Sequence, residues 1–348
     1  MTLTTQILDN YKHVFANDPI IVKAVTSASD IPAAAKLPQL VIKIVTNGHT
    51  HEIPQQFIPG DTLNVDISSA FQSEYQLLDR LSEPTPAPLL ALGGFPTETT
   101  YTPITATVTA YVRYLINGTE HTDNEYPVIS DLYVLRGGLP SSLRTIIQDP
   151  SSAVKDFAAR LTLKPLLPEI KNIGDTHITS AYDPSSHLVT TTATTVLAGS
   201  ASDSILPVSS PNRHQIIFRN SLGVFETFSV FSLEKKTNEV QSDSYPVITK
   251  PDYKPSLNIL TQASEPQLTY SMSTGFIPTA WAEWFVKEVL TATYHWMLLP
   301  HTHPATGEET MILTPVYLSA DEIVTIDKSK PTLREVKFNV SLNTQTKS

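Results

Sequence analysis

With 348 residues and a formal net charge of −10, the chain lacks the positive surface that direct nucleic-acid binding needs. It contains no cysteine, which excludes disulfide bonds, thiolate catalysis and sulfur-ligated metal sites. Hydrophobic residues make up 41% and charged residues only 17%, so the composition favours a folded protein rich in strands and turns.

The N-terminal stretch has no basic segment followed by an apolar core, so we expect no secretory signal. No apolar run approaches the roughly 20 residues that span a bilayer, and we expect a soluble protein made in a cytoplasm. Apolar side chains recur at helical spacing after Thr4 and Thr5, at Ile7, Leu8, Tyr11, Val14 and Phe15. They predict a short N-terminal helix, which either docks on its own chain or forms an arm that reaches a neighbouring subunit.

Two Asn-Gly pairs predict β-hairpins in the first part of the chain. Residues 39–45 alternate between apolar and polar and meet the pair at 47–48, after which 49–57 return. A longer alternating strand at 104–116 ends in the same way, at the pair 117–118. Each Asn-Gly pair suits a tight turn, since both residues tolerate the left-handed backbone conformation.

The central stretch predicts a hairpin at 215–231, with two aromatic-rich runs joined by 219–223. Strand alternation places Phe225, Thr227, Ser229 and Phe231 on one face and Val224, Glu226, Phe228 and Val230 on the other. Both faces carry aromatic residues. This strand is therefore expected to be covered on both sides, between two layers or against a partner chain.

Two further helices are predicted, a short one at 68–81 and a clear one at 278–291. Pro278 suits the first turn of the second helix, and one face is lined by Trp281, Trp284, Phe285 and Val289. Strands close the chain after it. The fold class is therefore mainly β, with two or three β-sandwich-like modules, this C-terminal helix and the short N-terminal helix.

Turn-rich stretches divide the chain into three predicted modules. An N-terminal β-sandwich-like domain is expected at 1–140, followed by a linker at 141–160. A middle β module at 161–255 holds the central hairpin. A C-terminal β module at 256–348 holds the helix.

The one cluster with the look of a metal site is His295, His301 and His303, which Glu308 or Glu309 could complete. The segment around them equally fits a polar hairpin loop between two strands, so we assign no metal. His49 and His51 share the spacing of His301 and His303 and receive the same interpretation.

Other motifs give no catalytic or cofactor-binding residues. The chain has no GxSxG, HExxH, phosphate-binding glycine loop or EF-hand loop, so we expect no enzyme and no cofactor. Gly137 and Gly138 are better explained by backbone geometry than by phosphate binding. An aromatic sugar-binding platform could be built from Trp281, Trp284, Trp296 and Tyr294, although helical spacing favours core packing for the first two.

Several short stretches resemble a family of structural proteins of tailed phages and prophages of Bacteroidota hosts. They are Asn17-Asp18-Pro19-Ile20, Val65-Asp66-Ile67-Ser68, Leu135-Arg136-Gly137-Gly138, the hairpin segment 218–228, the tract with Trp284, and the strands 311–316 and 333–342. The resemblance implies β-sandwich modules that assemble into tail or baseplate parts. The family has no catalytic motif to transfer.

The expected function is thus that of a virion structural protein in a phage tail or baseplate, acting through protein–protein assembly. Its partners would be other tail proteins and further copies of itself, as a ring or other homo-oligomer. Neither a nucleic-acid contact nor a membrane span is expected. The alternative is a glycan-binding adhesin or receptor-binding module, with a host-surface glycan as ligand; a glycan hydrolase is a third reading.

Overall fold

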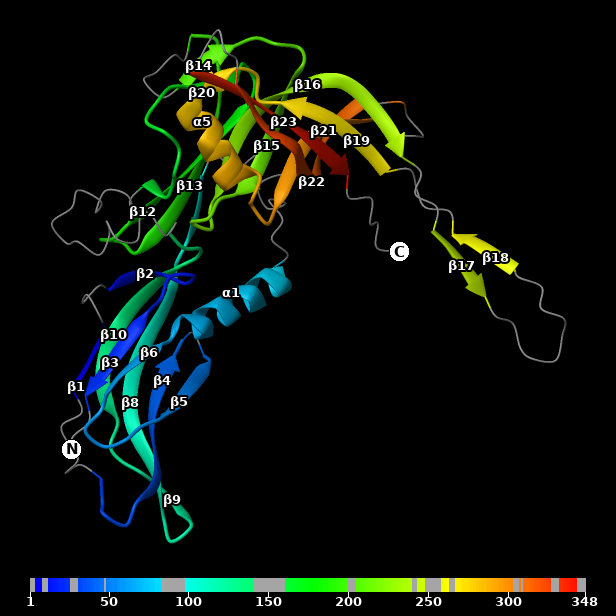
Figure 1. The fold of residues 1–348 in the computed structure, drawn as a ribbon. Helices are drawn as coiled ribbons and strands as arrows, with labels where there is room; N and C mark the ends of the chain where they lie inside the picture. The colour runs from blue at the N-terminus through cyan, green and yellow to red at the C-terminus, as the bar shows by residue number, and fades with distance from the viewer. Residues whose placement is uncertain are drawn as a thin grey trace. The chain divides into compact units, whose positions relative to one another are not determined.

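The computed structural model describes residues 4–7, 12–25, 31–46, 48–82, 98–139, 160–199, 205–239, 243–247, 258–262, 267–302, 307, 309–326 and 332–342 (Figure 1). It divides into two compact units. The first comprises Met1–Thr162, Ile178–Ala193 and Asn220–Phe225, and the second comprises Leu163–His177, Thr194–Arg219 and Glu226–Ser348.

The described elements confirm a mainly β chain with a helix near the C-terminus. In chain order they are β1 (Thr4–Ile7), β2 (His13–Phe15), β3 (Ile21–Val25), β4 (Lys36–Val45), β5 (Thr50–Gln56), β6 (Thr62–Asp66), α1 (Ser68–Ser82), β7 (Glu98–Tyr101), β8 (Ile104–Ile116), β9 (Thr119–Thr122), β10 (Tyr126–Leu135), β11 (Glu169–Asn172), β12 (Thr176–Asp183), β13 (Leu188–Thr195), β14 (Ile205–Val208), β15 (Arg213–Arg219), β16 (Phe225–Glu239), β17 (Asp243–Val247), β18 (Asn258–Gln262), β19 (Gln267–Ser273), β20 (Ile277–Pro278), α5 (Thr279–Trp284), the π-helix η2 (Phe285–Val289), β21 (His295–Thr302), β22 (Glu309–Ile326) and β23 (Leu333–Leu342).

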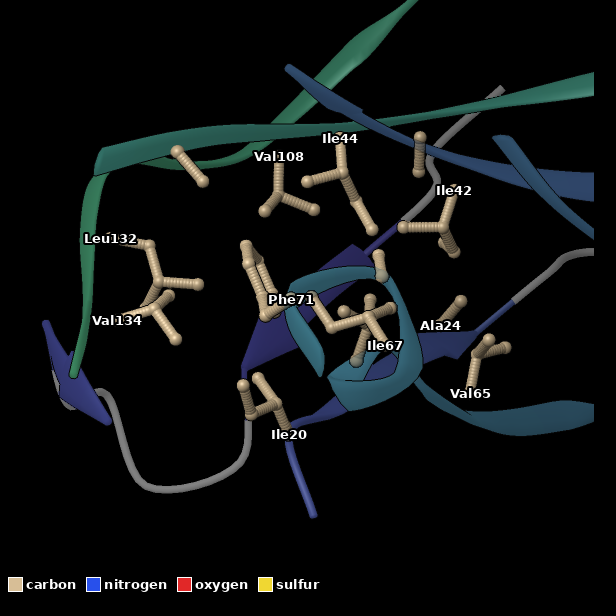
Figure 2. Close-up of a cluster of buried hydrophobic side chains, with 14 of the residues drawn as sticks. Ile20, Ala24, Ile42, Ile44, Val65, Ile67, Phe71, Val108, Leu132 and Val134 are labelled. Atoms are coloured by element: carbon tan, nitrogen blue, oxygen red, sulfur yellow. The ribbon is translucent and has the colours of Figure 1, made fainter. Parts of the chain in front are cut away.

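The first unit packs a large sheet against a small one. The large sheet has the order β2-β10-β8-β4-β5, with β9 paired to β8, and the small one has the order β1-β3-β6. In β8 the predicted alternation holds, because Ile104, Ala106, Val108, Ala110 and Val112 are all buried. Figure 2 shows Phe71 of α1 among core side chains of both sheets.

Both Asn-Gly hairpins and the short helix of this unit are confirmed. β4 pairs with β5 and β8 with β9, each antiparallel. At the second turn Asn117 and Gly118 have φ of 54° and 83°, the left-handed conformation that the pair was expected to supply. Asn47 of the first turn lies outside the described residues.

The predicted N-terminal helix is wrong for the residues that the structure describes. Thr4–Ile7 form β1, which pairs antiparallel with β3. His13–Phe15 form β2, which pairs parallel with β10. The apolar spacing of the segment fits a helix, but strand edges of β3 and β10 provide hydrogen-bond partners that local periodicity does not reveal.

The main sheet of the second unit closes on itself. Its order is β19-β16-β15-β21-β22-β23-β20. β19 also pairs with β23, which closes the strands from β19 to β23 into a ring, and the two-residue strand β20 adds to β23. Alternate residues of these strands point into one apolar core, including Phe218, Phe228, Met297 and Phe338. Trp281, Trp284 and Phe285 of α5 and η2 pack on the same core, so the predicted C-terminal helix is confirmed at 279–289.

The two units differ from the three modules predicted from the sequence. β15 and β16, assigned to the middle module at 161–255, share the closed sheet with β19, β21, β22 and β23, all of which belong to the predicted C-terminal module at 256–348. Residues 178–193, also from the middle module, belong to the first unit, where β13 pairs with β7. Because strands far apart in the chain pair with one another, the two units do not end at the turn-rich stretches of the sequence. Most of the predicted linker at 141–160 lies outside the described residues.

Candidate functional site

The most distinctive part of the second unit is a layer that lies on the outer face of β15 and β16. We name the described residues of 163–177 and 194–212 the covering layer. It contains β11 and β14, which pair in parallel, with Glu169 opposite Ile205 and Asn172 opposite Val208. It is fixed to the strands beneath by hydrogen bonds from Lys171 to Thr227 and from Arg213 to Ile170.

The central hairpin is covered on both sides, as predicted. Phe228 and Val230 of β16 point into the core of the closed sheet. Thr227 and Ser229, on the opposite face, are 0% exposed because the covering layer lies over them. The outer face of β16 is therefore polar and yet buried, so the layer above it has to supply hydrogen-bond partners.

A cluster of two ammonium groups and one carboxylate meets that polar face. Lys171 Nζ lies 2.6 Å from Glu169 Oε1 and donates to the Thr227 carbonyl at 2.8 Å. Lys164 Nζ donates to Glu169 Oε2 at 2.9 Å and to the same carbonyl at 2.8 Å. Glu169 is 3% exposed and Lys171 is 0% exposed, so the ions are held by one another and by Thr227, away from water.

Burial and neighbouring charge shift the pKa values in this cluster. Burial lowers the pKa of Lys171 to about 8, although the carboxylate of Glu169 opposes the shift. Burial alone would raise the pKa of Glu169, but the charges of Lys164 and Lys171 outweigh it and lower that pKa below its ordinary value. Removing Glu169 would leave both ammonium groups without their counter-charge, whereas without Lys171 the carboxylate would still be paired with Lys164.

Further polar contacts extend the attachment along the layer. Ser229 Oγ donates to Asp175 Oδ2 at 2.6 Å, and Thr176 N donates to Gln215 Oε1 at 3.1 Å. The Arg213 guanidinium lies 4.4 Å from the centre of the Phe231 ring. Burial, with the nearby charges of Lys164 and Lys171, lowers the pKa of His177 to about 4, so this imidazole is neutral at pH 7.

The covering layer exposes several large apolar side chains. Its exposed large side chains are Leu166 (90% exposed), Leu197 (62%), Leu206 (47%), Leu167 (44%) and Ile173 (38%). Leu206 lies opposite Ile170 in the β11–β14 pair, and Ile173 N donates to the Val208 carbonyl. Leu163 packs against the core of the closed sheet, whereas the other four leucines of the layer are exposed. The polarity of the layer is thus inverted, because its described charged side chains contact groups beneath it while most of its leucines are exposed.

This arrangement attaches a layer and presents an apolar surface. The ammonium and carboxylate groups lie beneath the layer, where a solute in water does not reach them. Sequence reasoning missed the cluster. The alternation Glu169-Ile170-Lys171 was the available signal, since it places two charges on one face of a strand and an isoleucine on the other.

The structure separates the histidines that the sequence grouped. His295 and His301 lie six residues apart on the continuous strand β21, which is about 20 Å at the usual rise per residue, too far to share one ion. His295 is 7% exposed, and its Nε2 contacts the Val289 carbonyl. Burial lowers its pKa. His303 and Glu308 lie outside the described residues, so the pairing of His301 with His303 stays a prediction.

The tryptophans of the sugar-binding hypothesis are buried. Trp281, Trp284 and Trp296 are 3%, 5% and 5% exposed. The first two meet edge to face at 5.2 Å within the core of the closed sheet. Trp296 is stacked on Tyr294 at 6.0 Å. These side chains form core contacts, and the platform that the sequence allowed is not presented to a ligand.

In the first unit His49 and His51 meet a glutamate that the sequence did not connect with them. His49 Nδ1 lies 3.0 Å and His51 Nε2 lies 2.6 Å from Glu74 Oε1 of α1. Burial would raise the pKa of Glu74, but hydrogen bonds with His51 and His49 outweigh it and lower that pKa. One ring nitrogen of each histidine thus contacts the carboxylate. Across the described residues, no three His, Cys, Asp or Glu side chains are grouped to hold a metal ion.

Three of the motifs behind the phage resemblance meet within the first unit. Gly138 N donates to the Ser221 carbonyl at 2.8 Å, and Leu139 N donates to Asp18 Oδ1 at 2.9 Å. A Cβ on Gly137 would lie 2.3 Å from the Ser221 oxygen. Gly137 and Gly138 therefore permit close backbone approach, which confirms the structural interpretation of this pair.

Comparisons with known proteins return no relative: no protein-family model, curated protein or solved structure matches the chain. Of the helices in the described ranges, none has both the length and the apolar character needed to cross a membrane.

Proposed function

We propose that the chain is a virion structural protein of a tailed phage, a component of the tail or its baseplate that works by assembling with other proteins. The observation that carries the proposal is the inverted polarity of the covering layer. A folded protein that turns its charges inward and its leucines outward gains free energy when another surface covers those leucines.

Two further observations support assembly over chemistry. The strongest charge cluster, around Glu169 and Lys171, lies beneath the layer and offers no group to a substrate. The motifs that resemble phage structural proteins meet at a tight backbone contact around Gly137, where they build the fold. The protein would be made in the host cytoplasm and reside in the virion, next to other tail proteins and further copies of itself.

Mass spectrometry of gradient-purified phage particles tests this proposal. We expect peptides of this chain in the particle band, in an amount that corresponds to several copies per particle. Abundant protein in the lysate with none in purified particles would contradict the proposal. Specific binding of the purified chain to a host-surface glycan, without incorporation into particles, would favour the adhesin alternative.

A further inference from the structure

We infer that the outward face of the covering layer is a self-association surface, which packs against the same face of a second copy of this chain. The inference rests on the proposed function, because it names the partner for the surface that carries that function. Its basis is the extent of the exposed apolar area and the distribution of charge.

The exposed apolar area is large enough for a specific contact. The exposed areas of the five leucine and isoleucine residues of the layer sum to roughly 500 Å². This sum is comparable to the roughly 300–600 Å² of the largest apolar patch on a typical monomer. A standard interface buries roughly 800 Å² on each partner, and homodimer interfaces are roughly 65% apolar. The patch thus supplies about the apolar share that one side of such an interface needs.

The charges of the layer favour a second copy as the partner. Its described residues include two cations and two carboxylates, and each contacts a partner on the inner side: Lys164, Glu169, Lys171 and Asp175. The layer is therefore neutral, while the whole chain carries a net charge of −10. Two copies would repel each other across an acidic surface, but the described residues of this face bring no like charges together.

Packing of a face against itself gives a two-fold contact, in which each residue of the patch on one copy meets the patch of the other. A ring would need an additional head-to-tail contact between such pairs. The immediate product of the surface is therefore a dimer.

Sedimentation equilibrium of the full chain, from roughly 1 to roughly 200 μM, tests the inference. The wild-type chain is expected to form dimers in this range. The double variant Leu166→Glu, Leu206→Glu places two carboxylates on each side of the contact, and its dissociation constant should rise at least about tenfold. The matched control, Ile58→Glu, adds a carboxylate at a side chain that is 71% exposed in the first unit, and it should dimerise like wild type.

Circular dichroism and tryptophan fluorescence establish that each variant is folded. A milder variant, Leu206→Ser, should weaken the dimer without added charge if the double variant does not fold. A wild-type chain that stays monomeric, or a double variant that dimerises as tightly as Ile58→Glu, would overturn the inference.

The particle experiment separates this inference from the proposed function. A monomeric chain that is nonetheless found in virions would overturn the second copy as partner and leave the structural role standing, with another tail protein on the layer. A chain that dimerises through Leu166 and Leu206 but is absent from particles would support the surface and contradict the virion role.

Discussion

In both the closed sheet and the covering layer of the second unit, side chains alternate between the two faces of a strand. The inward side chains are apolar in the closed sheet and charged in the covering layer. In the closed sheet, alternate residues such as Phe228 and Val230 point inward and form an apolar core. In β11 the inward residues are Glu169 and Lys171, because the surface beneath them presents the polar Thr227. The buried face of a strand is therefore determined by the surface that it contacts. The hydrophobicity of its side chains alone does not show which face is buried.

The largest effect is expected where the layer loses its carboxylate. Glu169→Ala leaves Lys164 and Lys171 buried without a counter-charge, which should lower the free energy of unfolding of the second unit by roughly 3–5 kcal/mol. Urea unfolding followed by tryptophan fluorescence measures it, since all three tryptophans lie in this unit.

The matched control for this variant is Glu283→Ala, which removes an exposed carboxylate 3.8 Å from Arg334. Its cost should stay below about 1 kcal/mol. Equal losses for the two variants would show that the buried cluster does not hold the layer.

A smaller loss is expected when the buried pair is replaced as a whole. The double variant Glu169→Leu, Lys171→Met exchanges two buried ions for apolar side chains of similar size and leaves Lys164 as the one cation without its carboxylate. It should therefore lose less stability than Glu169→Ala, which leaves both cations unpaired. The same urea experiment measures it. If the double variant were as unstable as the single one, the hydrogen bonds from Lys171 to Thr227 would matter more than charge compensation.

Acid should weaken the second unit through His177. Its pKa in the folded protein is about 4, below the ordinary 6.5, so the unfolded chain binds more protons between these values. The free energy of unfolding therefore falls as the pH falls from about 6.5 toward about 4. His177→Asn should show a smaller loss between pH 7 and pH 5 in urea unfolding. If the variant lost as much stability as wild type between pH 7 and pH 5, His177 would not be the cause. The acid sensitivity would then be assigned to His214 and His295, because burial lowers their pKa values too.

The smallest effect on folding is expected at the most exposed leucine. Leu166 is 90% exposed, so Leu166→Gln should change the free energy of unfolding by less than about 0.5 kcal/mol, measured on the monomer at low concentration. Phe285→Ala, in the apolar core, should cost roughly 3–5 kcal/mol in the same assay. A large loss for Leu166→Gln would place this leucine inside the folded unit and remove the contrast between the two regions.

Local patterns predicted the hairpins and the C-terminal helix well. The central hairpin and its two covered faces followed from alternation and from the turn residues around Gly223, whose φ is 82°. The Asn-Gly turn at Asn117 and the helix lined by Trp281 followed in the same way. Both features depend only on residues that lie close together in the sequence.

Long-range pairing was not predictable in this manner. Closure of the sheet depends on contacts such as Ile216 with Met297 and Thr269 with Ser341, which alternation does not specify. The same limit explains the N-terminal strands β1 and β2. The charge cluster was missed because the sequence Glu169-Ile170-Lys171 is typical of a surface strand. Only the structure shows that the polar face of β16 lies beneath it.

Hydroxyl-radical footprinting of Leu166 and Leu206 shows whether the covering layer is the contact surface, by comparing purified protein at low concentration with the protein in its assembled form. Tyr317, which is 67% exposed outside the layer, serves as the reference. We expect both leucines to react readily in the dilute protein and to be protected on assembly, while labelling of Tyr317 changes less. Equal labelling of the leucines in both forms would contradict the covering layer as the contact surface.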